Sequence, residues 1–201
     1  MKFIPTNRYT YDNKELFIFY QLNENRFDMF IRTDPNGTDY GSLIMFLSSK
    51  YCNDGIYLDS ITINYEKFPK ENLKGLGKFM LCTSISILLN EYHLQFDKIC
   101  LNAYSELYDT SFKAQNWTDE DLMNYIKGNV LAQKYYKEYM INFGEFNKEE
   151  IIEELSRAKS EEKLIKYYET YGFKVAERYA KGKTGTFMVA ELSSIKTNCK
   201  I

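Results

Sequence analysis

Histidine is nearly absent from this sequence of 201 residues, where His93 is the only one. A Ser-His-Asp triad or a histidine-rich zinc site would have to be built around that single side chain, so both are disfavoured. We therefore expect no metal site.

Cysteines are few and are not arranged as a motif. Cys52, Cys82, Cys100 and Cys199 are widely separated, and no C-x-x-C pair occurs. That spacing disfavours a zinc ribbon or a thioredoxin-like redox centre. We expect reduced, mostly buried thiols.

Long apolar runs and a charge excess are also missing. The segment from Met1 to Lys14 is polar, and no later stretch approaches the length of apolar sequence that crosses a bilayer. We expect a cytoplasmic protein with no membrane partner. The formal net charge of −2 provides no broad basic field, which disfavours nucleic acid as a partner.

Apolar residues make up 44% of the chain and aromatic residues 16%, which is enough to bury a core. We predict one domain over residues 1–201. Aromatic and β-branched residues concentrate in segments separated by turn-forming residues, and these predict antiparallel strands at Glu15–Leu22, Arg26–Arg32, Tyr40–Ser48 and Ile56–Asn64.

From Gly75 the apolar residues recur at helical spacing, which predicts a core helix to about His93. A strand at Phe96–Ala103 follows. Residues 105–160 then form a predicted helical insertion, in which Thr118–Asp121 and Asn147–Glu150 are typical helix starts.

A last helix is predicted from about Glu161 to Tyr171, ended by Gly172 in the left-handed conformation. Strands at Phe173–Tyr179 and Thr186–Leu192 close the chain around a turn. The order of strands and helices predicts an α/β (α+β) fold with a mostly antiparallel central sheet flanked by helices.

The sharpest local signal is the run Asn72-Leu73-Lys74-Gly75-Leu76-Gly77-Lys78, between a strand and an amphipathic helix. Glycines allow close backbone approach, and the amides at a helix N-terminus attract phosphate oxygens, although such a run also serves as a simple turn. A Walker A loop fails at Asn72 and Phe79, and a dinucleotide fingerprint fails at Met80.

These residues resemble the GNAT superfamily of acetyl-CoA-dependent N-acetyltransferases. The match to the family motif Gln/Arg-x-x-Gly-x-Gly/Ala lies at Asn72, Gly75 and Gly77, after the alternating strand Leu58–Ile63. The run Leu164–Phe173 is similar to the family's later Phe-Tyr-x-x-x-Gly-Phe segment. Asn72 in place of Gln or Arg, a long loop from Tyr65 to Lys74 and a short Leu22–Arg26 connection depart from the pattern.

The resemblance implies that acetyl-CoA is the acyl donor and that its pantetheine arm pairs with a strand edge. The implied cofactor-binding residues are Ile61, Thr62 and Ile63 on that edge, the loop residues Asn72, Leu73, Lys74, Gly75, Leu76, Gly77 and Lys78, and Asn102. Asn102 alternatively makes only a strand-end hydrogen bond.

The resemblance also implies catalytic roles. Tyr168 matches the family tyrosine that donates a proton to the leaving thiolate, and packing is the alternative role for it. Asp59 is the first candidate for the base, and Glu66 is the second unless it is merely solvated.

The implied reaction is transfer of an acetyl group from acetyl-CoA to a primary amine on a small molecule, peptide or protein. The predicted partners are acetyl-CoA and that amine, with a homodimer as a further option. Trp117–Leu155 is expected to be mostly helical and to border the acceptor site. The alternative functions are a non-catalytic acyl-CoA-binding or interaction module and a glycine loop that is only a turn.

Overall fold

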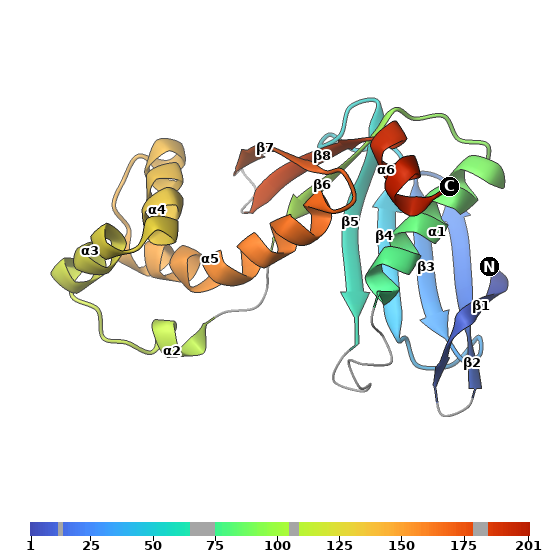
Figure 1. The fold of residues 1–201 in the computed structure, drawn as a ribbon, viewed down its shortest axis with the longest axis horizontal. Coiled ribbons are helices and arrows are strands. Elements are labelled where there is room, and N and C mark those ends of the chain that lie inside the picture. Colours follow the sequence, from blue (N-terminus) through green and yellow to red (C-terminus); the bar gives the residue numbers. More distant parts are fainter. Residues whose placement is uncertain (12–13, 65–74, 105–108, 179–184) are drawn as a thin grey trace. The chain divides into compact units, whose positions relative to one another are not determined.

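The computed structural model describes residues 1–11, 14–64, 75–104, 109–178 and 185–201 (Figure 1). The chain divides into two compact units. The first comprises Met1–Leu101 and Val189–Ile201, and the second comprises Asn102–Met188. The mixed α/β class and the large, mostly antiparallel sheet are as predicted.

The first unit is built on an open sheet. Its strands are hydrogen-bonded in the order β1-β2-β3-β4-β5-β6-β8, and the end of β6 and the start of β8 belong to the second unit. Successive pairs from β1 to β5 are antiparallel, whereas β5 and β6 are parallel because a helix connects them. The bounds are Lys2–Tyr11 (β1), Lys14–Asn23 (β2), Arg26–Arg32 (β3), Gly41–Phe46 (β4), Gly55–Ile63 (β5), Lys98–Ala103 (β6) and Thr186–Glu191 (β8).

Strands β2 to β6 fall where the sequence predicts them, but β1 was missed. Its polar residues hide the alternation that marks a strand, and its register with β2 shifts between Pro5 and Thr10. Pairing with β2 therefore determines this strand more than its own composition does.

Two helices cover one face of this sheet, as Figure 1 shows. Helix α1 (Leu76–Asn90) contacts β4 and β5, and α6 (Leu192–Cys199), which was not predicted, contacts α1. Gly41 allows the close approach of α1, because a Cβ there would lie 2.9 Å from the Met80 sulfur and 3.4 Å from a Leu76 methyl carbon.

The expectation of reduced thiols is wrong. Disulfides join Cys52 to Cys100 and Cys82 to Cys199, with Cα atoms 5.7 and 5.3 Å apart. The partners are 48 and 117 residues apart in sequence, so only the fold brings them together. Disulfides persist mainly in oxidising compartments, and the cytoplasmic location stays a prediction. No helix in the described part of the chain is long and apolar enough to cross a membrane.

The Cys82–Cys199 disulfide ties the C-terminal helix to α1. We expect the double variant Cys82→Ser/Cys199→Ser to lose roughly 2–4 kcal/mol of unfolding free energy, since a cross-link over a long loop restricts the unfolded chain. Urea unfolding without reductant measures the difference. A midpoint equal to that of the wild type would contradict the cross-link.

The second unit is mainly helical, as predicted for the insertion. It contains α2 (Thr110–Lys113), α3 (Asp119–Gly128), α4 (Val130–Phe143), α5 (Lys148–Glu169) and β7 (Lys174–Arg178), the neighbour of β8. Its core is formed by apolar side chains of the helices: Phe112, Leu122, Ile126, Ala132, Tyr135, Tyr139, Ile151, Leu155 and Ala158. The predicted helix starts are confirmed, with Thr118 and Asn147 as N-caps.

Helix α5 corrects the prediction of two separate helices in its range. It runs unbroken for 22 residues, because no glycine or proline interrupts it. Buried charged side chains on it have hydrogen-bond partners: Arg157 donates to Glu154, and the Thr186 hydroxyl donates to Glu161 Oε1 at 3.0 Å. Beyond the helix, Gly172 has a φ of 92°, the left-handed conformation that was predicted.

Candidate functional site

The described part of the glycine loop is Gly75–Lys78, where α1 begins. Gly75 has a φ of 81°, and among the described residues no side chain caps the helix. The first turn contains no acidic residue. Side chains cap α3, α4 and α5, whereas α6 resembles α1 in having no side-chain cap. An uncapped N-terminus leaves backbone amides and the positive end of the helix dipole for an anionic ligand. Glu66, Asn72, Leu73 and Lys74 lie outside the described residues.

Tyr9 is an element of this site that the sequence did not reveal. Its ring lies 5.2 Å from that of Phe79, and its hydroxyl lies 3.6 Å from the position of a Cβ on Gly75. A local turn positions it, because the Tyr9 amide donates to the Thr6 hydroxyl at 3.1 Å. With β1 unrecognised, no pattern connected Tyr9 with a loop more than sixty residues later in the sequence.

Both the pairing of strand β5 with β4 and the burial of its residues change at Asp59. Ile44 of β4 pairs with Ser60 and Met45 pairs with Leu58, so Asp59 is the extra residue of a β-bulge. Residues before it are buried, whereas Asp59 and Thr62 are exposed and Ile61 and Ile63 are half-buried. The described ladder between β5 and β6 also ends at Leu58, opposite Leu101.

The segment from Asp59 to Ile63 thus keeps β4 on one side while its ladder with β6 has ended on the other. Such an edge presents backbone N–H and C=O groups that an extended ligand can pair with. The Thr62 carbonyl lies 3.3 Å from the Cβ position of Gly41, and a Leu76 methyl carbon lies 3.4 Å from the same point. The end of β5 and the start of α1 therefore both approach Gly41 of β4.

Tyr168 lies on the inward face of α5 in the second unit. It is 8% exposed, and its ring packs edge-on against Phe173 at 5.7 Å and Tyr167 at 5.4 Å. Burial, with a contribution from Tyr171, raises the pKa of Tyr168 to about 12. The hydroxyl therefore stays protonated at neutral pH and acts as a donor. Tyr167 is 36% exposed, as its position on the helix predicts.

Asn102, on β6, belongs to the second unit. Its Nδ2 lies 3.1 Å from the Cβ position of Gly185, which has a φ of 98°. The predicted site residues therefore fall into two sets. Asp59, Ile61–Ile63 and Gly75–Lys78 are in the first unit, and Asn102 and Tyr168 are in the second.

Comparison with known proteins adds no relative to this picture. No protein-family model matches the chain, and no curated protein matches it.

Proposed function

We propose that this protein is an N-acetyltransferase of the GNAT type, which transfers an acetyl group from acetyl-CoA to a primary amine. One observation carries the proposal: a strand with a bulge at Asp59 and an edge past Leu58 leads, through the loop, to an uncapped helix start at Gly75. An extended ligand with a phosphorylated end fits that combination of features.

The pyrophosphate of acetyl-CoA would accept hydrogen bonds from the amides at the start of α1. Gly75 tolerates its left-handed conformation without strain, and Gly77 has no side chain to separate the backbone from a phosphate. Lys78 is exposed on the first turn and adds a positive charge there. Asn72, Leu73 and Lys74 complete the proposed loop on sequence grounds alone.

The pantetheine arm would pair with the β5 edge from Ile61 to Ile63, as an added strand would. Its thioester end would then approach Asp59, whose side chain the bulge turns outward. Asn102 is proposed as a further hydrogen-bond partner of the cofactor.

In the proposed reaction the amine nitrogen attacks the thioester carbonyl carbon, and the carbon–sulfur bond breaks. A lysine-like amine has an ordinary pKa of about 10.4, so it must lose a proton before attack. Asp59 is proposed to accept that proton, directly or through water, with Glu66 as the second candidate. Tyr168 is proposed to supply a proton to the departing thiolate.

The alternative is a non-catalytic acyl-CoA-binding module, and two observations favour it. The rings around Tyr168 are consistent with a packing role. In addition, β2 and β3 are joined by only Glu24 and Asn25, with no helices between them to shape an acceptor site. This module would bind acetyl-CoA without turning it over.

Titration with acetyl-CoA followed by a thiol-release screen of primary amines tests the proposal. Binding together with amine-dependent thiol release supports the enzyme. Binding with no thiol release in the presence of any amine supports the non-catalytic module. Absence of binding contradicts both the enzyme and the module.

A further inference from the structure

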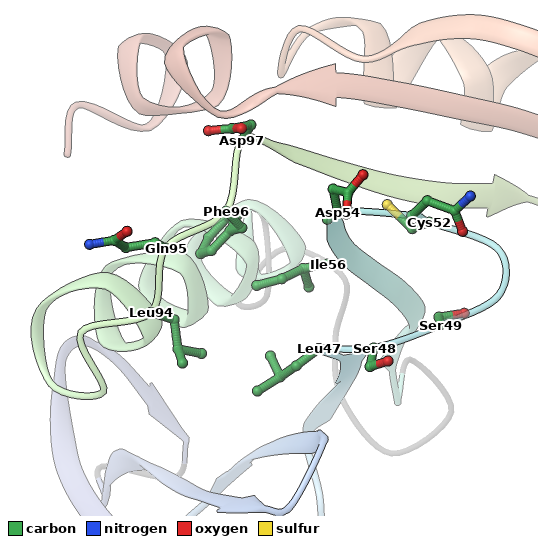
Figure 2. Close-up of a pocket in the computed structure, with 12 residues that line it drawn as sticks. Leu47, Ser48, Ser49, Cys52, Asp54, Ile56, Leu94, Gln95, Phe96 and Asp97 are labelled. Atoms are coloured by element: carbon green, nitrogen blue, oxygen red, sulfur yellow. The ribbon is translucent and has the colours of Figure 1, made fainter.

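A cavity of about 740 Å³ in the first unit contains none of the residues discussed for acyl transfer (Figure 2). Its wall comes from the end of β4 and the following loop, the start of β5, and the link from α1 to β6. The lining residues are Leu47, Ser48, Ser49, Cys52, Asn53, Asp54, Gly55, Ile56, Leu94, Gln95, Phe96 and Asp97. Cavities of roughly 300–1,000 Å³ are typical of small-molecule sites.

The two carboxylates of the cavity lie at one end, whereas the other end is mixed, with Ser48 beside Leu47. In Figure 2, Asp54 and Asp97 lie at one end, and Leu47 and Leu94 lie at the other. The side chains of Ile56 and Phe96 lie between them. A ligand with a polar head at the carboxylates and an apolar body against Ile56 and Phe96 would fit this wall.

The charged residues of the lining indicate which kind of polar group the ligand would carry. Asp54 and Asp97 are the only charged residues among the twelve, and both are exposed. Within the described ranges, neither carboxylate has a basic ion-pair partner. A cation placed between them would be attracted by both, whereas an anion would be repelled.

The wall is held in place before any ligand binds. The Cys52–Cys100 disulfide ties the loop after β4 to β6, and the Cys52 amide donates to the Ser49 carbonyl at 3.0 Å. On the other side, the Asp97 carbonyl accepts from the Leu192 amide at 2.7 Å. A preformed wall lowers the ordering cost of binding.

We propose that this cavity binds a small organic amine, with its ammonium group between Asp54 and Asp97 and its apolar body against Ile56 and Phe96. The cavity lies at the Gly55 end of β5. Asp59 is four residues beyond Gly55 on this strand, which is about 13 Å at roughly 3.3 Å per residue. It is therefore a second ligand site, and it does not rest on the proposed acyl transfer.

The test titrates 2-phenylethylamine into the full chain without acyl-CoA, with neutral 2-phenylethanol and anionic phenylacetate as comparisons. The amine is expected to bind most tightly of the three. Asp54→Asn/Asp97→Asn should weaken amine binding about three- to tenfold, given the modest strength of exposed ion pairs, and leave the alcohol unaffected. Asparagine tolerates the φ of 59° at Asp54, so the backbone is preserved.

Glu120→Gln/Glu149→Gln is the matched control, because it removes two exposed carboxylates from the second unit, outside the cavity. It should bind the amine as the wild type does. Equal binding of amine and alcohol, or wild-type amine binding by Asp54→Asn/Asp97→Asn, would overturn the proposal. Equal weakening of amine binding in the control would also overturn it, since the effect would then not come from the cavity.

Discussion

Replacing Tyr168 by phenylalanine is expected to lower kcat for acetyl transfer on the order of 100-fold, the usual contribution of a positioned general acid. The acetyl-CoA dissociation constant should change little, because the proposed proton donation occurs only in the chemical step. The variant keeps the aromatic ring and with it the contacts to Phe173 and Tyr167. Steady-state kinetics together with a binding titration separate the two effects.

Tyr167→Phe is the matched control, since it removes the same hydroxyl from the adjacent, outward-facing position. It should change kcat less than about twofold, as surface substitutions away from a site usually do. The pKa of Tyr168, raised to about 12, adds a second expectation. Its hydroxyl should not deprotonate below about pH 11, so no loss of rate below that value should come from this residue. Near-wild-type rates in both variants would contradict the general-acid role of Tyr168 and indicate a packing role.

Valine in place of Gly77 is expected to abolish detectable acetyl-CoA binding. Gly77 is the second residue of α1, and a branched side chain there would hold the pyrophosphate away from the amides of the first turn. A titration calorimeter measures the loss, which we expect to exceed about 100-fold, since several charge-assisted hydrogen bonds are removed together.

Because Gly77 is buried, the ligand-free melting curve of this variant must be measured first. Gly77→Ala gives a smaller step at the same position if the valine variant does not fold. Gly128→Val is the control, since a Cβ added at Gly128 meets nothing within 4 Å. A folded Gly77→Val protein that binds acetyl-CoA like the wild type would show that the phosphates bind elsewhere.

Much of the fold could be predicted because its signals are local. Aromatic and β-branched residues between turns predict β2 to β4, and alternation predicts β5. A change of period predicts α1, and Thr118 and Asn147 predict the starts of α3 and α5. The failures involve long-range partners. Strand β1 depends on pairing with β2, and the two disulfides depend on contacts between distant parts of the chain.

The candidate site was predicted only in part, for a similar reason. The glycine pair and Tyr168 are visible as short motifs in the sequence. In the structure the glycines lie at the start of α1, and Tyr168 lies on the buried face of α5. The bulge at Asp59 depends on the register with β4, and the approach of Tyr9 to Gly75 depends on β1. Neither the bulge nor the approach of Tyr9 can be recognised from the local sequence.

The most direct measurement of the central claim is the melting temperature of the full chain as acetyl-CoA is added. A ligand that binds only the folded state stabilises it by about 2.7 kcal/mol at one hundred times its dissociation constant. We expect an upward shift that grows with acetyl-CoA concentration and is absent in Gly77→Val. No shift at millimolar acetyl-CoA would contradict the central claim.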